Sequence, residues 1–380
     1  MLSFRLKQYA KMAAQQLFLP VCYRFFCVRR IRKGSVVFAD AHHNKRPPSM
    51  DTLYFALKRS GKCKVTEIYL DYQNTSFFTL LAGMIRFMRL YAVAEYVVIC
   101  DNFLPAASCR KRKGTKVIQL WHACGCLKRF GYDAPDDIPP SFKGHVFKNT
   151  DLVTVSSPAC VPAFAGAMKL PEQNVISAGV CRTDAFYSEN WISRKRDAFY
   201  EMYPDAAGKK IAVWAPTFRG NAAEGKSIRI DLDKLSSELG PEWKLLACLH
   251  PHMKAEDPDD PHLCPLPCQD LFPVTDVLIA DYSSLIFEYM LFNRSLILYC
   301  PDLEEYSRKR GFYLDYGKIP AVHVMRRQDL ASKIRLAGPG PDEELRREIS
   351  LFLEKYMSSC DGKAAKRIRF LIEEGELPPW

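Results

Sequence analysis

The sequence predicts an α/β fold made of two Rossmann-like domains that face each other across a cleft. Strand-like apolar runs alternate with amphipathic helical patterns, which is typical of βα units and a mostly parallel sheet. The alternation breaks at a Pro- and Gly-containing stretch, residues 204–208, and then restarts. A chain of 380 residues is also too long for one ordinary core. We therefore expect domains at 34–205 and 206–380, preceded by a basic segment at 1–33.

The first 33 residues mix bulky apolar side chains with Lys and Arg, which predicts basic amphipathic helices. Such helices suit an anionic membrane surface, although a basic helix packed on the protein has the same composition. No run reaches the roughly 20 apolar residues that a spanning helix needs, and no secretory signal is evident. We therefore expect a peripheral protein at the cytoplasmic face of the cell membrane, held by 1–33 with help from 77–91.

The composition is that of a basic globular protein with reduced cysteines. The formal net charge is +11, and without a nucleic-acid motif a membrane or phosphates explain it better than nucleic acid. Most of the 14 cysteines stand in apolar runs, where they act as small buried side chains in a reducing cytoplasm. The His and Cys residues at 250–268 have no standard zinc spacing. We expect no metal site and no required cofactor; the sequence leaves room for a divalent cation without indicating one.

The strand ends carry the functional signal, because ligands of open α/β sheets bind beyond the carboxyl ends of the strands. The expected strands lie at 35–39, 65–70, 96–100, 116–121, 152–155 and 174–178, and then at 210–214, 243–249, 276–280 and 295–300. The loops that follow them are rich in His, Arg, Ser and Asp, at 40–43, 101–102, 122–125, 156–158, 179–182, 215–219, 250–252 and 281–284. Few loops without a ligand carry so many such side chains, so we expect an enzyme that handles phosphates.

One of these loops has a specific pattern. The buried strand at 277–280 runs into Asp281, Ser283 and Ser284, and apolar periodicity then resumes as a helix. Backbone N–H groups at a helix start bind phosphate, and serine hydroxyls add donors. An isolated serine pair would more simply be a helix cap, but the His and Arg loops at equivalent strand ends favour the phosphate site.

Taken together, the strand ends resemble the CDP-glycerol glycerophosphotransferase family of wall teichoic acid synthesis. The matching pieces run in order at 119–122, 127–128, 131, 179–184, 215–219, 250–251, 281–284, 299–306 and 310–313. Residues 121–128 read Trp-His-Ala-Cys-Gly-Cys-Leu-Lys, whereas polymerase members typically read Trp-His-Gly-Thr-Pro-Leu-Lys. The His-Ala-x-Gly form is more similar to the shorter primase-type members, and the short chain agrees with them.

The resemblance implies transfer of glycerol phosphate from CDP-glycerol to a hydroxyl of an undecaprenyl-pyrophosphate-linked disaccharide, with release of CMP. An alcohol is a poor nucleophile, so a positioned base helps, and His122 is the candidate. His250 and Asp281 complete the implied catalytic set. The phosphates and ribose of the donor are assigned to Thr217, Arg219, Ser283, Ser284, Glu288, Arg310 and Gly311. The acceptor side is assigned to Gly125, Lys128, Arg182 and Asp184.

Other interpretations stay open at this point. His122 could be a core or phosphate-binding histidine, Arg310 a solvated charge, and Glu288 a helix-surface glutamate. Asp281 could orient a histidine or cap its own turn. A teichoic acid polymerase, a CDP-ribitol-using enzyme and a nucleotide-sugar glycosyltransferase with the same GT-B-like arrangement are the enzymatic alternatives. A membrane-associated module that binds teichoic acid intermediates is the non-enzymatic one, and a homo-oligomer is compatible with all of them.

Overall fold

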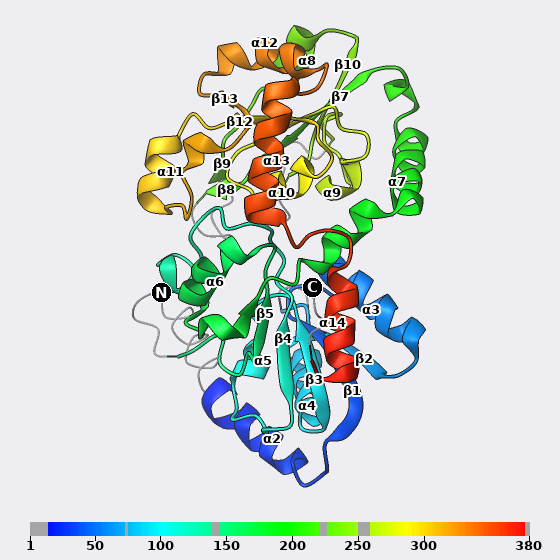
Figure 1. Ribbon diagram of the computed structural model, residues 1–380, viewed down its shortest axis with the longest axis vertical. Helices are drawn as coiled ribbons and strands as arrows, with labels where there is room; N and C mark the ends of the chain where they lie inside the picture. The colour runs from blue at the N-terminus through cyan, green and yellow to red at the C-terminus, as the bar shows by residue number, and fades with distance from the viewer. Residues whose placement is uncertain (1–13, 73–74, 139–143, 220–225, 250–258, 377–380) are drawn as a thin grey trace. The chain divides into compact units, whose positions relative to one another are not determined.

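The chain forms two compact α/β units (Figure 1). The computed structural model describes residues 14–72, 75–138, 144–219, 226–249 and 259–376. Unit 1 comprises Met1–His122, Ser141–Ala185 and Ser359–Trp380, and unit 2 comprises Ala123–Pro140 and Phe186–Ser358. The chain therefore changes unit after His122, Pro140, Ala185 and Ser358.

Unit 1 is built on a fully parallel six-stranded sheet of order β2-β1-β3-β4-β5-β6. Its strands are β1 (Arg32–Asp40), β2 (Lys64–Tyr69), β3 (Ala94–Ile99), β4 (Lys116–Gln119), β5 (Leu152–Thr154) and β6 (Val175–Ile176). Its helices are α2 (Leu19–Phe26), α3 (Pro48–Ser60), α4 (Phe77–Tyr91), α5 (Leu104–Ala107), α6 (Val161–Met168) and α14 (Ala364–Glu374). Successive side chains of a strand point to opposite faces. The sheet therefore has a core on each side.

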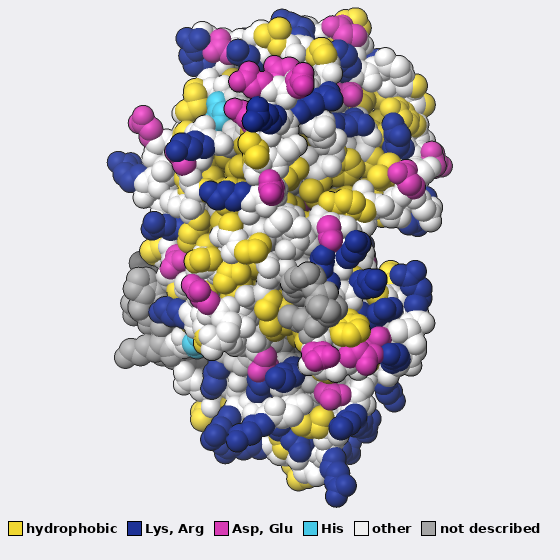
Figure 2. All heavy atoms as spheres, viewed as in Figure 1, with side chains coloured by type: hydrophobic (Ala, Val, Ile, Leu, Met, Phe, Trp, Pro, Cys, Tyr) yellow, Lys and Arg dark blue, Asp and Glu magenta, His cyan; other side chains and the backbone are white. Residues whose placement is uncertain are grey.

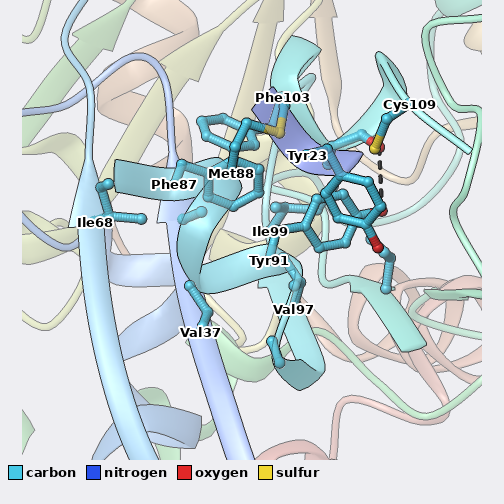
Figure 3. Close-up of a cluster of buried hydrophobic side chains, with 14 of the residues drawn as sticks. Tyr23, Val37, Ile68, Phe87, Met88, Tyr91, Val97, Ile99, Phe103 and Cys109 are labelled. Atoms are coloured by element: carbon cyan, nitrogen blue, oxygen red, sulfur yellow. Dashed lines mark hydrogen bonds between the residues drawn. The ribbon is translucent and has the colours of Figure 1, made fainter. Parts of the chain in front are cut away.

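Figure 3 shows one of these cores, in which Val37 of β1 packs with Phe87 and Tyr91 of α4. The helix α2 joins it through Leu19 and Tyr23, and the Tyr23 and Tyr91 rings lie 5.0 Å apart between centroids. The opposite face of the sheet packs against α3 and α14, which lie side by side in Figure 1. The N-terminal helix is therefore part of the body of unit 1.

Unit 2 is built on a parallel five-stranded sheet of order β10-β7-β11-β12-β13. Its strands are β7 (Lys210–Ala215), β10 (Trp243–Ala247), β11 (Val277–Ala280), β12 (Ser295–Tyr299) and β13 (Val322–Val324), beside an antiparallel pair of β8 (Phe218–Arg219) and β9 (Lys226–Ser227). Its helices are α7 (Glu189–Met202), α8 (Leu232–Leu239), α9 (Cys268–Leu271), α10 (Leu285–Met290), α11 (Leu303–Lys309), α12 (Arg327–Ala337) and α13 (Glu343–Met357).

Short helical turns complete the structure. They are the π-helical η1 (Ala14–Phe18) and the 3₁₀ turns η2 (Gly131–Asp133), η3 (Pro158–Cys160), η4 (Glu172–Asn174), η5 (Cys181–Tyr187), η6 (Pro204–Ala206) and η7 (Tyr316–Lys318). The predicted α/β class with two parallel sheets is confirmed. The edge strand β13 was missed, because a strand of three residues has little periodicity of its own. None of the described helices combines the length and apolar character needed to cross a membrane.

Candidate active site

Three neighbouring strands of unit 1 bring a cluster of His and Asp side chains together. β1, β3 and β4 are adjacent and parallel, so their carboxyl ends share one edge of the sheet. The residues beyond these ends form what we call the histidine cluster: Asp40, His42, His43, Asp101 and His122. The sequence placed only His122 of this group in the site.

His122 is held through Nδ1 of its ring. Nδ1 lies 3.1 Å from the carbonyl oxygen of Cys100 and 3.4 Å from Oδ2 of Asp101. A carbonyl oxygen can only accept, so Nδ1 carries the hydrogen and donates it. The neutral ring then has its lone pair on Nε2, which is the form that a general base needs. The side chain is 44% exposed, so a substrate hydroxyl can reach it.

The turn that presents His122 is strained and braced. Trp121 has a φ of 58°, a left-handed conformation that costs a bulky residue about 1–3 kcal/mol and is concentrated at functional sites. Its ring stacks on that of His122, with centroids 4.5 Å apart. The backbone N–H of Trp121 donates to Oε1 of Gln119, and Nε2 of Gln119 donates to the carbonyl oxygen of Asp101. One buried amide therefore ties the end of β3 to the turn after β4.

Asp40 organises the other side of the cluster. Its Oδ2 accepts hydrogen bonds from the backbone N–H groups of His42 and His43 and contacts Nδ1 of His43 at 2.8 Å. Burial favours the neutral carboxyl, but the bonds from His43 and His42 outweigh it and lower the pKa of Asp40. The same bond to Asp40 raises the pKa of His43. An ionised Asp40 beside a readily protonated His43 is the result.

Two residues assigned to the acceptor side lie in unit 1 with different surroundings. Burial and two nearby carboxylates raise the pKa of the Cys100 thiol, and the charge of Arg182 opposes this rise. Arg182 therefore lies near the histidine cluster. Asp184 instead caps α14: its two oxygens accept from the backbone N–H groups of Ala364 and Ala365 at 3.0 and 2.7 Å. Burial raises the pKa of Asp184 to about 6. The structure gives Asp184 an anchoring role.

In unit 2, Arg219 lies in a network of acidic groups. Its Nε and Nη2 form a bidentate pair with the Asp302 carboxylate, at 2.8 and 3.2 Å. Its Nη1 lies 2.9 Å from Oδ2 of Asp281 and donates to the carbonyl oxygen of Thr217. Burial raises the pKa of Asp281, and Arg219 opposes the rise. Most N–H groups of Arg219 are therefore used to join the loops after β7, β11 and β12.

Aromatic rings extend this network. The Arg219 guanidinium lies 4.7 Å from the ring centre of Tyr282 and 5.1 Å from that of Tyr306. These two rings stack with centroids 3.8 Å apart, and the Tyr282 hydroxyl donates to Asp302. The neighbouring Thr217 hydroxyl is buried and has no hydrogen-bond partner among the described residues. It is a polar group that a bound ligand could satisfy.

The segment after His122 pairs with the loop that follows α11. Backbone contacts join residues 127–129 to residues 311–313 in an antiparallel arrangement. The N–H of Arg129 donates to the carbonyl oxygen of Gly311 at 3.1 Å. Gly311 has a φ of 75°, and a Cβ there would come within 3.2 Å of the Arg129 side chain. The backbone conformation therefore favours glycine here, and a larger residue would also need the Arg129 side chain to shift slightly.

Arg310 and Lys128 flank this pairing. Nη2 of Arg310 donates to Asp137 at 2.7 Å and Nε donates to the carbonyl oxygen of Arg129 at 2.8 Å, which excludes a merely solvated charge. Burial and the nearby Arg310 lower the pKa of Lys128 to about 8. The electrostatic partners of Lys128 include Arg219 as well. The structure thus groups Lys128 with residues assigned to the donor, although the sequence assigned it to the acceptor side.

The serine pair stands between β11 and α10, as predicted. The Ser283 hydroxyl accepts from the N–H of Leu285 at 3.4 Å, and both Ser283 and Ser284 are partly exposed. Glu288 is fully buried in α10, which excludes a helix-surface glutamate.

Gly125 lies on the segment that unit 2 carries, with a φ of 64°, and a Cβ there would come within 2.4 Å of the Phe287 ring. Close packing accounts for this glycine.

His250 lies outside the described residues. Among the described residues, no group of three or more His, Cys, Asp and Glu side chains is arranged to hold a metal ion.

Sequence reasoning missed Asp101 and Asp302 as site residues. Both follow predicted strands, at 96–100 and 295–300, so their position was a usable signal. What the sequence lacked was the order of the strands. Asp101 matters because β3 is adjacent to β4, and Asp302 because the loop after β12 meets the loop after β7.

Comparisons with known proteins agree with this geometry. The family profile described as CDP-Glycerol:Poly(glycerophosphate) glycerophosphotransferase matches residues 21–374. A teichoic acid ribitol-phosphate primase of Bacillus spizizenii is 32% identical over 358 residues, which cover 90% of this chain and 91% of that protein. A teichoic acid glycerol-phosphate primase of the same organism is 30% identical over 73% of this chain and 74% of its own.

A poly(ribitol-phosphate) polymerase of that organism is 33% identical, but the match covers 74% of this chain and only 47% of the polymerase. Among solved structures, the wall teichoic acid polymerase TagF is similar with a TM-score of 0.72 and 18% identity, covering 97% of each chain. This likeness concerns the fold alone.

Proposed function

Since the chain belongs to the CDP-glycerol:poly(glycerophosphate) glycerophosphotransferase family, we propose that it catalyses a primase-type step of teichoic acid synthesis. In this step glycerol phosphate passes from CDP-glycerol to a hydroxyl of an undecaprenyl-pyrophosphate-linked disaccharide, and CMP is released. The His-Ala-x-Gly form of residues 122–125 and the primase relatives support the choice of a primase over a polymerase.

The observation that carries the proposal is the state of His122. Its Nδ1 is committed to the Cys100 carbonyl oxygen, so Nε2 is the basic atom on a ring open to solvent. The acceptor hydroxyl gives its proton to Nε2 as its oxygen attacks the β-phosphorus of the donor. The bond between that phosphorus and the bridging oxygen breaks, and the electron pair leaves with CMP.

The donor phosphates are proposed to bind in unit 2. Phosphoryl transfer depends on charge neutralisation more than on covalent chemistry. Lys128 supplies an ammonium group whose pKa is about 8. A bound anion would favour the protonated form of this group. The Thr217 hydroxyl and the hydroxyls of Ser283 and Ser284 supply hydrogen-bond donors, while Arg219 and Arg310 hold the loops that carry them. Glycosyl transfer and a non-catalytic binding module have no comparable support.

A CDP-ribitol donor is the second candidate, because the ribitol-phosphate primase matches along almost the whole of both chains. Glycerol and ribitol differ in the length of the polyol, and primases of both kinds are about equally identical to this chain, at 30% and 32%.

The test incubates the full chain with the lipid-linked disaccharide and either CDP-glycerol or CDP-ribitol, and follows both CMP release and the number of units added. One added unit defines a primase, and a ladder of products would refute the primase assignment. We expect His122→Ala to lower turnover by about a hundredfold to ten-thousandfold while donor affinity persists. Turnover of this variant near the wild-type rate would show that His122 is not the base.

We also propose that the enzyme works at an anionic membrane surface and binds it through α2. This helix buries Leu19 and Tyr23 in the unit 1 core but exposes Val21 and Phe25 by 66% and 73%. Lys and Arg side chains gather over the same end of unit 1 (Figure 2). Further apolar side chains are exposed on and next to this helix and at the start of α4: Leu17, Val28, Phe77 and Phe78. Apolar burial and charge attraction act together at such an interface.

Point substitutions test this, since deletion of residues 1–33 would remove Leu19 and Tyr23 from the core. We expect Val21→Ser with Phe25→Ser to weaken sedimentation with anionic liposomes, and neutral liposomes to bind less than anionic ones at low salt. Leu336→Ser is the matched control, because Leu336 is 73% exposed on α12 of unit 2. Equal sedimentation of the double variant and wild type would refute the assignment of this surface.

A further inference from the structure

The carboxylate of Asp101 lies 3.4 Å from the imidazole of the proposed base. We propose that Asp101 is a positioning residue for His122: it orients the imidazole and stabilises the imidazolium ion that forms when Nε2 takes the proton of the acceptor. The inference rests on the proposed function, because it assumes that His122 is the base.

The position of the carboxylate is fixed by its own contacts. Oδ1 of Asp101 accepts the backbone N–H of Asn102 at 2.6 Å, which orients the carboxylate and leaves Oδ2 to face the histidines. Oδ2 lies 3.4 Å from Nδ1 of His122. The Nδ1 hydrogen is donated to the carbonyl oxygen of Cys100, which fixes the tautomer. The Asp101 carboxylate lies beside the same N–H group as a negative charge.

The backbone around the pair is fixed by Gln119. This side chain is fully buried and uses both ends of its amide, donating to the carbonyl oxygen of Asp101 and accepting from the N–H of Trp121. It sets the separation between the loop that carries Asp101 and the turn that carries His122. The stacked Trp121 ring limits rotation of the imidazole. The geometry is therefore built before substrate binds, which is what efficient proton transfer requires.

The proton balance gives the carboxylate its role. The neutral imidazole gains a proton at Nε2 during attack and becomes a cation, and this proton later passes to water. A negative charge beside Nδ1 stabilises that cation and so lowers the barrier to proton transfer. Asp281, which the sequence offered as an orienting group, is committed instead to Arg219 and to two backbone N–H groups in unit 2.

A second imidazole competes for the same oxygen. Nε2 of His42 lies 3.9 Å from Oδ2 of Asp101. The other charged groups of this edge are Asp40, which pairs with His43, and Arg182, which acts on Cys100. The contact of Asp101 with His122 is the shorter of the two, which favours the pairing of Asp101 with His122. A variant of His42 distinguishes the two pairings.

The kinetic experiment compares Asp101→Asn, Asp101→Glu and His42→Gln with wild type. Asn keeps the size of the side chain and an acceptor oxygen but removes the charge. We expect Asp101→Asn to lower kcat by about tenfold to a hundredfold, to leave KM for the CDP-polyol within about twofold, and to move the acid limb of the pH–rate profile to lower pH. Asp101→Glu should recover part of kcat. Glu172→Gln, at an exposed carboxylate of unit 1, is the control for loss of charge alone.

A substrate-free experiment separates this proposal from the proposed function. The ring-nitrogen shifts of His122, assigned by comparison with His122→Gln, are measured by NMR in the wild-type chain and in Asp101→Asn. We expect Asp101→Asn to increase the share of the tautomer that carries its hydrogen on Nε2, even if neither CDP-glycerol nor CDP-ribitol is turned over. Unchanged ring-nitrogen shifts, or a loss of kcat in His42→Gln equal to that in Asp101→Asn, would overturn the proposal.

Discussion

Replacement of Arg219 by lysine should destabilise unit 2 even though the charge is kept. Arg219 makes a two-pronged pair with Asp302, contacts the fully buried Asp281 and donates to the Thr217 carbonyl oxygen. A single ammonium cannot reproduce the planar fork, so at least two charge-assisted bonds are lost at about 1.5 kcal/mol or more each. Loss of stacking on Tyr282 adds about 0.5–1 kcal/mol. We therefore expect the free energy of unfolding to fall by about 3–4 kcal/mol.

The assay is urea unfolding followed by tryptophan fluorescence, beside calorimetric titration with CDP-glycerol. The matched control is Arg326→Lys, which alters an exposed Arg–Asp pair and should change the unfolding free energy by less than about 0.5 kcal/mol. If Arg219→Lys unfolded like wild type but bound CDP-glycerol weakly, the network would not be structural, and Arg219 would instead be a direct ligand of the donor.

Three further predictions concern charge. The pKa of Lys128 is lowered to about 8, so its cation is lost as pH rises through 8: calorimetry should show CDP-glycerol affinity falling between pH 7 and 9 in wild type but not in Lys128→Arg. The pKa of Asp184 is raised from 3.8 to about 6, so the folded state favours the protonated carboxyl. The contribution of this carboxyl to the free energy of unfolding is present below pH 3.8 and lost as pH rises through 6. Urea unfolding of Asp184→Asn should lack this part of the pH dependence. Arg310→Met and Asp137→Asn remove the same ion pair, so both should make residues 127–137 more sensitive to chymotrypsin, and a variant cleaved like wild type would contradict this.

The sheets could be predicted because their signal is local. Apolar runs such as 277–280 appear as strands within a residue or two of the expected bounds. The assignment of residues 123–140 to unit 2 could not be predicted in this way. Its partners are far away in sequence, since Arg310 and Asp137 are 173 positions apart. No periodicity within the segment encodes that pairing.

The histidine cluster shows the same limit. The sequence marked 40–43, 101–102 and the residues after 121 as polar strand ends, and each of these loops reaches the cluster. It could not tell which loops meet, because that depends on the strand order β2-β1-β3-β4. With the doubly wound order 2-1-3-4-5 assumed, the strand before His122 is adjacent to the strand before Asp101, and the pair becomes predictable.

The distribution of charge in unit 2 also separates two kinds of cation. Arg219 is committed to Asp281 and Asp302, and Arg310 to Asp137, so each arginine is largely neutralised where it lies. Arginine suits this use because its planar fork pairs two oxygens at once and stays charged at any ordinary pH. Lys128 differs, since burial lowers its pKa to about 8 and a bound diphosphate would raise it again. The arginines therefore hold the loops in place, and we propose that Lys128 is the cation whose charge responds to the donor.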